Sequence, residues 1–276
     1  MPASDQYAIT FACYNQLDYT RQCVDSLVAT GVDLKRVAVV DNGSTDGTQA
    51  YLEQQPFGAV ILNQVNLGCG VAWNQGALAL QAPWTIVMNN DVICAPGWLD
   101  GLIATAQARR LQIVSPSMVE GPLDYDFAAF AEEARHRMAG TVRDADAHAV
   151  CMAIHADVWQ EVGYFMPVPR LLGYEDAIFF HKARQHGLRM GIAGASWLHH
   201  YGMTTQKALK LERHLSNNAS LGDRGLLKGF LQQKWIGRQF ARRRLKALRR
   251  RARAHELAEH GISVHGLRNP AGFEWI

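Results

Sequence analysis

Long apolar runs are absent from the sequence. Although 48% of its 276 residues are hydrophobic, no run approaches the roughly 18 residues that a membrane-spanning helix needs. The first residues carry Asp5 and no basic residue before the short apolar run Ala8–Ala12, which is not the pattern of a secretory signal. We therefore expect a cytoplasmic protein whose core suffices for one large domain or two small ones.

Cysteine is scarce and scattered. The five cysteines include no Cys-x-x-Cys pair, so neither the usual structural zinc motif nor a disulfide framework is indicated. We expect reduced thiols that fill core and loop positions.

Charge is unevenly distributed, although the formal net charge is only +3. Residues 207–276 hold 16 Lys/Arg and 5 Asp/Glu, whereas residues 1–206 hold 12 and 20. An acidic body (1–206) thus precedes a basic, helical extension (207–276), and the two parts are expected to meet different partners.

Strand-like and helix-like segments alternate over the first 90 residues or so. This order predicts a parallel α/β sheet, in which ligands bind outside the carboxyl ends of the strands. The expected strands are Tyr7–Cys13, Val37–Val40, Ala59–Leu62 and Trp84–Met88. The expected helices between them are Arg21–Ala29, Thr48–Gln54 and Ala72–Leu80.

The later part of the chain is less regular. Gly121 to Asp146 is charged and irregular, and we expect a mobile loop or small subdomain there. A helix is expected from about Glu175 to Gly187, a strand over Ile192–Leu198, and one or two long basic helices from Leu226 to about His260.

Polar clusters follow several of these strands. Asn89-Asn90-Asp91 suits Mg²⁺ or Mn²⁺ held by carboxylate together with phosphate oxygens, or else a turn that caps backbone groups. Asp41 has the same placement, with an N-cap or turn role as the alternative, for which Asp46 is the better candidate.

Three further clusters carry candidate chemistry. Gly68, Gly70 and Gly76, with Asn66 and Asn74, precede and open a helix whose N-terminus would favour a diphosphate. Glu175-Asp176 is either a pair of acids favoured in a first helical turn or the source of a general base. His199-His200 is either a contributor to a metal shell or a hydrogen-bonded surface pair.

Together these segments resemble the family 2 glycosyltransferases, which have the GT-A fold, and most of all their single-addition, rhamnosyltransferase-like bacterial members. The likeness runs from Ile9 to Gly202, with a weaker continuation to about Gly237. It is carried by five segments: Phe11-Ala12-Cys13-Tyr14-Asn15, Val40 to Thr48, Asn66-Leu67-Gly68 with Ala72, Asn74 and Gly76, Asn89-Asn90-Asp91, and Gly163-Tyr164-Phe165 followed by Glu175-Asp176, with His199 to Gly202 as a late His-x-x-Gly.

The resemblance implies a nucleotide-sugar half (about 1–115) and an acceptor half (about 116–206). Asp41 would bind the nucleobase, helped by Asn66 and the backbone near Ala12–Tyr14. The remaining donor-binding positions would be Asn15, Gly68, Asn74, Asn89 and Asn90.

It also implies the catalytic groups. Asp91 would bind Mg²⁺ or Mn²⁺ on the diphosphate of the donor, and His199, or less so His200, would complete that site. Asp176 would be the catalytic base and Glu175 would orient it or the acceptor, for a single displacement with inversion. The acceptor would be a glycan or lipid-linked glycan in cell-surface glycan assembly.

The sequence departs from the family pattern in three places. Asn89 replaces the first Asp of Asp-x-Asp, Ile178 stands where many members of the wider group have another acid, and no Gln-x-x-Arg-Trp signature of processive synthases is found. The last departure favours addition of a single sugar.

The segment 234–253 holds ten basic residues and no acid, with apolar residues interleaved. This pattern suits either a helix that lies on an anionic membrane or a helix packed on the body. In the first case the enzyme would be peripheral on the inner face of the membrane. Nucleic acid is a disfavoured partner, because no nucleic-acid-binding fold is evident.

Two alternatives stay open. A nucleotidyltransferase would share the sheet and the metal carboxylate but usually opens with a glycine-rich basic loop, unlike Cys13-Tyr14-Asn15-Gln16. A non-catalytic nucleotide- or carbohydrate-binding protein on the same fold is kept open by Asn89.

Overall fold

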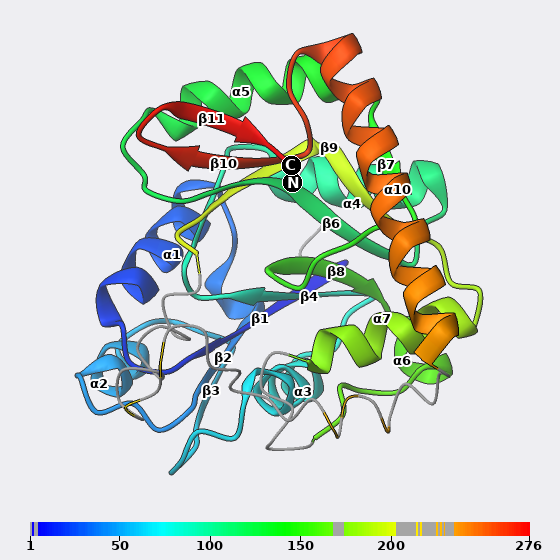
Figure 1. Ribbon diagram of the computed structural model, residues 1–276. Coiled ribbons are helices and arrows are strands. Elements are labelled where there is room, and N and C mark those ends of the chain that lie inside the picture. The colour runs from blue at the N-terminus through cyan, green and yellow to red at the C-terminus, as the bar shows by residue number, and fades with distance from the viewer. Residues whose placement is uncertain are drawn as a thin grey trace.

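The computed structural model describes residues 2, 5–167, 174–202, 214, 216, 225, 227, 229 and 235–276, with the backbone alone over 235–242. Within these residues the chain forms one curled, mixed 11-stranded sheet with helices on both faces (Figure 1). The path along the sheet is β11-β10-β6-β8-β4-β1-β2-β3, and β9 pairs with β5, β6 and β7 beside it.

The first part of the sheet is parallel, as predicted. Strand β1 pairs with both β2 and β4, and β2 pairs with β3, all in parallel. The bounds are β1 Tyr7–Cys13, β2 Val37–Asp41, β3 Ala59–Leu62 and β4 Trp84–Asn89, with α1 Leu17–Ala29, the 3₁₀ turn η1 Leu34–Arg36, α2 Thr48–Glu53 and α3 Cys69–Ala79 between them. The four predicted strands are confirmed to within one residue, and α1 and α3 begin three or four residues earlier than expected.

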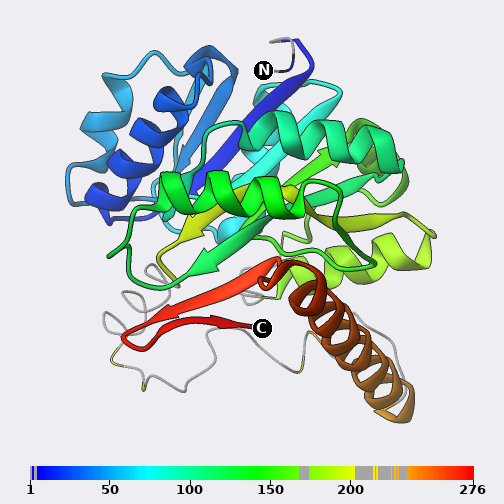
Figure 2. The same ribbon diagram turned by 90° about the horizontal axis from the view of Figure 1, so that it is seen from above.

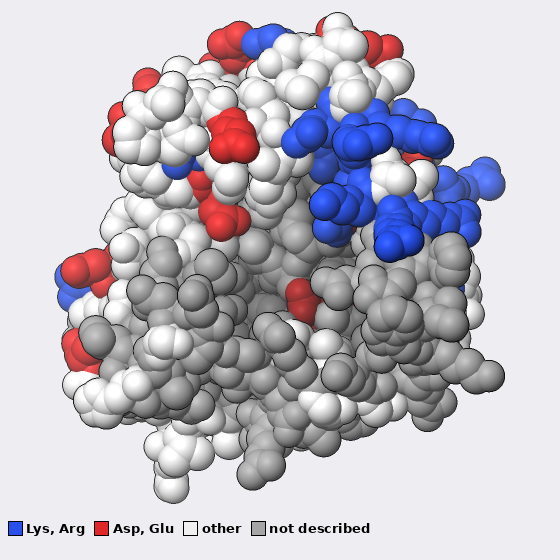
Figure 3. All heavy atoms as spheres, in the orientation of Figure 1, with Lys and Arg blue, Asp and Glu red and all other residues white. Residues whose placement is uncertain are grey.

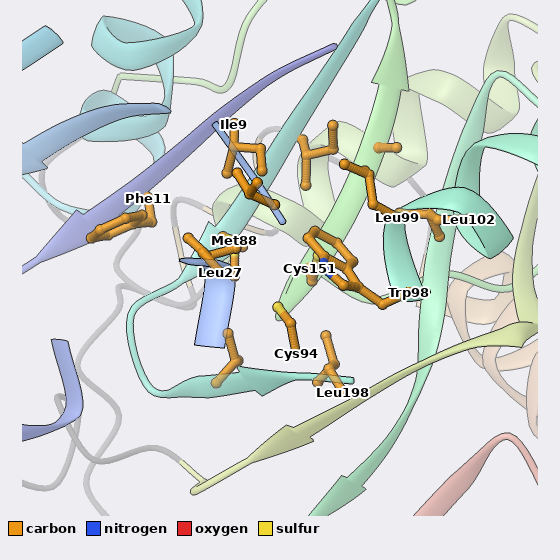
Figure 4. Close-up of a cluster of buried hydrophobic side chains, with 14 of the residues drawn as sticks. Ile9, Phe11, Leu27, Met88, Cys94, Trp98, Leu99, Leu102, Cys151 and Leu198 are labelled. Carbon is orange, nitrogen blue, oxygen red and sulfur yellow. The ribbon is translucent and has the colours of Figure 1, made fainter. Parts of the chain in front are cut away.

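Both faces of this sheet are buried, which explains its nearly continuous apolar strands. Ile9 and Phe11 of β1 face a cluster that includes α1 and the helix α4 (Trp98–Arg109), with Leu27, Trp98 and Leu99 among its fully buried members (Figure 4). Ala12 and Val40 face the opposite cluster, formed with α3, α6 (Ala156–Glu161) and α7 (Glu175–Gln185).

The later strands join this sheet in mixed directions. The strand β8 (Cys151–His155) lies antiparallel between β4 and β6 (Ile113–Glu120). The long strand β9 (Met190–His200) runs parallel to β6 and pairs antiparallel with β5 (Val92–Cys94) and β7 (Val142–Asp144). His199 and His200 are thus the last residues of a strand rather than the turn after it.

The expectation that Gly121–Asp146 is irregular, a mobile loop or a small subdomain, is wrong in that the segment has regular structure. It contains the helix α5 (Phe127–Met138) as well as β7. Asp126 caps α5, because its Oδ1 accepts the Ala129 N–H at 3.0 Å. The helix packs Phe127, Ala131, Ala134 and Met138 into a third apolar cluster.

The basic segment forms the predicted helix, α10 (Trp235–His260), but the chain does not end in helix. It continues into β10 (His265–Asn269) and β11 (Gly272–Trp275), a hairpin whose β10 adds to the sheet parallel to β6. Figure 2 shows the hairpin and α10 together along one side of the molecule. The expected boundary at 206/207 lies outside the described residues.

A buried ion pair attaches α10 to the body. Arg143 of β7 donates two hydrogen bonds to Glu256 of α10, at 3.0 and 2.7 Å, and a third at 2.7 Å to Ser263. Arg249 donates to Asp146 at 2.8 and 2.5 Å. The C-terminal half of α10 is therefore packed on the body, as one of the two expectations for this helix had it.

Among the described residues no helix is both long enough and apolar enough to cross a membrane. All five cysteines are free, four of them buried and Cys69 partly so.

Candidate functional site

The loops that follow β1 and β2 are joined by hydrogen bonds. Asn15, at φ +53°, accepts the Thr45 N–H on its side-chain oxygen at 2.8 Å, and its own N–H donates to the Ser44 hydroxyl at 2.7 Å. The two loops line an open hollow of about 530 Å³. Buried Ala12 and half-buried Tyr14 flank the last residue of β1, and so lie at the carboxyl end of that strand.

Asp41 is fully buried and engaged with its own loop. Its Oδ1 accepts the backbone N–H groups of Gly43 and Ser44 at 3.0 and 2.9 Å and the Gln49 amide at 2.8 Å. Its Oδ2 lies 3.8 Å from the Cys13 thiol. These bonds give Asp41 the loop-fixing role, and its contact with a nucleobase stays a prediction.

The glycine-rich turn before α3 has the geometry expected of it. Gly68 has φ +91°, and the side-chain oxygen of Asn66 accepts its N–H at 2.9 Å. A Cβ at Gly70 would lie only 3.1 Å from the Cβ of Glu175, so a glycine allows α7 to approach the start of α3.

Asn74 is occupied by the backbone of another segment. Its amide donates to the Phe165 carbonyl at 2.8 Å and its oxygen accepts the Phe165 N–H at 3.0 Å. It therefore anchors the Gly163–Phe165 segment to α3, and its contact with a nucleotide sugar stays a prediction.

Three candidate carboxylates gather around the first residue of α3. Burial and, in decreasing order, the charges of Glu175, Asp91 and Asp176 raise the pKa of the Cys69 thiol to about 12. The acids come from the β4–β5 turn and from the start of α7, about 84 residues apart in the sequence. The fold thus brings the predicted metal ligand and the predicted catalytic pair to the N-terminus of one helix.

The two acids of α7 differ in environment. Glu175 is buried, and its Oε2 accepts the Tyr174 N–H at 2.7 Å. Asp176 is partly buried and accepts the Ala177 N–H at 2.7 Å. Burial raises the pKa of Asp176 above its ordinary value, which makes its carboxylate a stronger base than one in water.

The three residues Asn89, Asn90 and Asp91, at the end of β4 and just after it, lie in different environments. Asn89 is the half-buried last residue of the strand. Asn90 is buried and donates to the Thr20 hydroxyl of α1 at 2.9 Å, which makes it a structural link. Asp91 is buried, and its Oδ1 lies 3.3 Å from Nε2 of His200.

The two histidines at the end of β9 are both buried and lie in different environments. His200 lies between two carboxylates, with Nε2 near Asp91 and Nδ1 3.5 Å from Oε2 of Glu120. Nδ1 of His199 lies 3.0 Å from the Tyr125 hydroxyl, and its ring packs on Tyr125 and Phe127. The geometry therefore favours His200 over His199, the first choice from sequence, as the histidine beside Asp91.

The pKa values of the two histidines are shifted in opposite directions. Burial lowers the pKa of His199 to about 4. Burial also disfavours charge on His200, but Asp91 and Glu120 prevail and raise its pKa to about 9. The nearby rings of His200 and His265, 3.5 and 3.8 Å from Oε2, in turn hold the pKa of Glu120 well below its usual range. The space between Asp91 and Glu120, where the His200 ring lies, therefore stabilises positive charge.

Asp91 and His200 fit a divalent cation. Both ring nitrogens of His200 are buried without a hydrogen bond of good geometry, and Nε2 is aimed at a carboxylate oxygen. The described residues contain no group of three or more potential protein ligands. Mg²⁺ and Mn²⁺ do not require one, since phosphate oxygens and water complete such sites.

Glu120 was not among the residues singled out from the sequence. It ends β6, and an acid at the end of a buried strand is the same signal that selected Asp41 and Asp91. The signal was missed because β6 itself was not recognised.

The family model "Glycosyl transferase family 2" matches residues 9–155. Two curated relatives, both N-acetylglucosaminyl-diphospho-decaprenol L-rhamnosyltransferases from strains CDC 1551 / Oshkosh and H37Rv of Mycobacterium tuberculosis, are 39% identical over 82 residues, or 25% of this chain. The match spans 27% of those proteins' length, about a quarter.

Solved structures with the same fold are more distant in sequence. GalNAc-T7 with UDP, GalNAc and Mn²⁺ aligns with a TM-score of 0.54 at 16% identity, over 71% of this chain and 43% of that one. The mannosyltransferase PcManGT from Pyrobaculum calidifontis, in complex with GDP-Man and Mn²⁺, aligns with a TM-score of 0.54 at 17% identity, over 75% and 60%. These likenesses confirm the GT-A type of fold.

The family model covers more than half of the chain, and it takes in the Asp41 loop, the glycine-rich turn and Asp91. The chain therefore belongs to glycosyl transferase family 2.

Proposed function

We propose that this enzyme moves one sugar from a nucleotide-diphosphate sugar to an acceptor hydroxyl, with inversion and with the help of Mn²⁺ or Mg²⁺. The observation that carries the proposal is the approach of α7 to the start of α3, where a Cβ at Gly70 would lie 3.1 Å from Glu175 and where the charges of Glu175, Asp91 and Asp176 act on Cys69. A site for sugar transfer needs a cation beside the leaving diphosphate and a base beside the acceptor. Asp91 would bind the cation, and Asp176 of the Glu175–Asp176 pair would be the base.

The donor diphosphate would lie at the N-terminus of α3. Unpaired N–H groups and the helix dipole favour an anion there, and Gly68 and Gly70 allow close approach. Asp91 and His200 would hold the divalent cation, which when bound neutralises charge that develops on the leaving diphosphate. Asn89 would contribute an amide that donates to the ribose or offers its oxygen to the cation.

Asp176 would act as the general base. The acceptor hydroxyl is a poor nucleophile, and a carboxylate with a raised proton affinity takes its proton more readily. Glu175, held by the Tyr174 N–H, would orient Asp176 or the acceptor. Because base and leaving group lie on opposite sides of the anomeric carbon in a single displacement, the product has inverted configuration.

For the substrates we take guidance from the relatives. The curated relatives are named as rhamnosyltransferases that act on a diphospho-decaprenol-linked sugar, and PcManGT is in complex with GDP-Man. We propose a glycan or lipid-linked glycan as acceptor, in cell-surface glycan assembly in the cytoplasm.

A nucleotide-release assay with purified full-length protein tests this proposal. We expect the release of a nucleoside diphosphate from at least one of a set of UDP-, GDP- and TDP-sugars. This release should depend on Mn²⁺ or Mg²⁺ and should be accelerated by the acceptor. Tight donor binding without any turnover would instead support a non-catalytic binding protein, the alternative that Asn89 keeps open.

We also propose that α10 attaches the enzyme to an anionic membrane. Arg243, Arg244, Lys246, Arg250 and Arg251 are all exposed. Leu248, 45% exposed, adds apolar surface among them. Figure 3 shows Lys and Arg side chains gathered over this helix, beside a hollow on the same face.

Vesicle co-sedimentation at low salt tests the membrane proposal. Reversal of Arg243 and Arg244 to Glu should weaken binding to phosphatidylglycerol vesicles at least about tenfold, since each basic residue near an anionic surface contributes about 1 kcal/mol. The matched control reverses Lys35 and Arg110, which are exposed elsewhere, and should bind normally. Equal binding by all three proteins would exclude α10 as the membrane contact.

A further inference from the structure

The C-terminal hairpin reaches the candidate metal site. Strand β6 lies between β9 and β10, and all three run in the same direction. In register, Glu120 is opposite His200 of β9 on one side and Leu267 of β10 on the other. Figures 1 and 2 show β10 beside β6, although the two strands are separated by about 145 residues in the sequence.

The side chain of Glu120 lies near one histidine from each neighbouring strand, His200 of β9 and His265 of β10. Oε2 of Glu120 lies 3.5 Å from Nδ1 of His200 and 3.8 Å from Nε2 of His265. His200 is 5% exposed, and Glu120 is only 26% exposed. The backbone at Gly202 backs the Glu120 side chain, since a Cβ there would lie 3.4 Å from its Cγ.

The imidazole of His200 separates Glu120 from Asp91. Its two nitrogens lie on different edges of the ring, with Nε2 3.3 Å from Asp91 and Nδ1 facing Glu120. A carboxylate that accepts the Nδ1 proton leaves the Nε2 lone pair free for a cation and fixes the ring orientation. Glu120 itself would not touch the cation.

We propose that Glu120 is a positioning residue for His200, and that His265 of β10 holds Glu120 in place. The inference rests on the proposed metal site of Asp91 and His200. It makes the C-terminal hairpin, which lies outside the matched family region, a support of the donor site.

Electron paramagnetic resonance of Mn²⁺ tests this inference on full-length protein. Titrations use Mn²⁺ alone and Mn²⁺ with UDP, GDP or TDP, and nitrogen modulation from ¹⁵N-histidine-labelled protein reports whether a histidine is bound to the metal. Thermal unfolding of each variant without metal checks that the fold is retained.

Glu120→Ala should weaken Mn²⁺ affinity about 10- to 100-fold, the usual effect of removing the partner of a metal-binding histidine, and should reduce the nitrogen modulation at saturating Mn²⁺. Glu120→Gln, which keeps a hydrogen-bond acceptor without the charge, should recover part of both. His265→Ala should act in the same direction by a smaller factor. Glu274→Ala, an exposed acid on β11, is the matched control and should change neither.

The outcomes separate this inference from the proposed function. Wild-type affinity and modulation in Glu120→Ala would overturn the positioning role alone. Equal losses in Glu120→Ala and Glu120→Gln, with intact modulation, would show that Glu120 acts only through its charge, which also overturns it. Mn²⁺ binding by the wild type without nitrogen modulation would remove His200 as a ligand while leaving Asp91. Absence of Mn²⁺ binding by the wild type would remove the metal site itself.

Discussion

The parallel part of the sheet, β1 to β4, and the later part, β5 to β11, hold their functional residues in different ways. Asp41 and Asn66 are held by hydrogen bonds to residues within eight positions in sequence. His200, Glu120 and Glu256 are held by partners about 80 to 145 residues away. Changes at Asp41 and Asn66 should therefore act on their own loops. Changes at His200, Glu120 and Glu256 should act across the molecule.

Asp91 lies where the two parts meet, and its loss should have the largest effect. Asp91→Ala should lower the rate of metal-dependent transfer at least about a thousandfold. Losing the cation's stabilisation raises the activation free energy by several kcal/mol, and each increment of about 1.4 kcal/mol lowers the rate tenfold. Calorimetry should show loss of metal-dependent donor binding with the fold intact. The exposed Asp25→Ala on α1 is the control, and unchanged metal–nucleotide affinity in Asp91→Ala would remove Asp91 as a ligand.

Asp176 tests the acceptor side. Asp176→Asn should bind donor and metal nearly normally yet transfer sugar roughly 10²–10⁴-fold more slowly, the usual effect of losing a positioned base. Glu175→Gln should impair acceptor affinity more than turnover. If Asp176→Asn is active while Glu175→Gln is dead, the two roles are exchanged.

The pH dependence of Asp176 gives a second test of its role. A base must be deprotonated, so activity should fall as pH decreases through its pKa. Because burial raises that pKa, the fall should lie above the ordinary Asp value of 3.8. The kcat–pH profile of Asp176→Asn should lack this acidic limb, and a limb that persists there would assign it to another group.

Glu256 tests the long-range contacts of the later part. Its removal leaves Arg143 buried without its charge partner, so Glu256→Leu should lower the free energy of unfolding by about 3–5 kcal/mol. The double variant Arg143→Met/Glu256→Leu should recover much of this loss. Glu133→Ala, which breaks an exposed pair with Arg137, should cost at most about 1 kcal/mol in the same urea titration. Equal effects of the two single changes would contradict the assigned role of the buried pair.

Asp41 tests the local character of the first part. Asp41→Ala leaves the Gly43 and Ser44 N–H groups without their acceptor, which should cost about 1–3 kcal/mol per group left buried. Nucleotide binding should weaken even without metal, unlike in Asp91→Ala. Unchanged nucleoside affinity would mean that Asp41 only fixes its loop. The N-cap variant Asp33→Ala on η1 provides a matched control.

The same difference decides how much could be predicted from sequence. The strands β1 to β4 and the helices between them follow one another in short units, so apolar runs and turn residues sufficed to place them. The hairpin of β10 and β11 was missed because β10 joins β6 across about 145 residues, which no local pattern encodes. The helix α5 did carry signals, an Asp126 cap and apolar residues at helical spacing, but its many charges concealed them.

The site was predicted to a similar degree. The carboxylates Asp91, Glu175 and Asp176 lie together, as the order of strands and the family resemblance implied. The choice between His199 and His200 needed the register of β9 against β5, where Val92 pairs with His200. Asn74 and Asn90 use their amides to link α3 and α1 to the rest of the fold, a role that no sequence pattern indicated, and their contact with a donor stays a prediction.

The most direct test of a metal-dependent transfer at Asp91 and Asp176 is single-turnover release of nucleoside diphosphate from the donor that wild-type protein uses. We expect Mn²⁺- or Mg²⁺-dependent release by the wild type, none by Asp91→Ala, and slow release by Asp176→Asn despite normal donor binding. Release by chelator-treated wild type at the full rate, or wild-type rates in both variants, would contradict it.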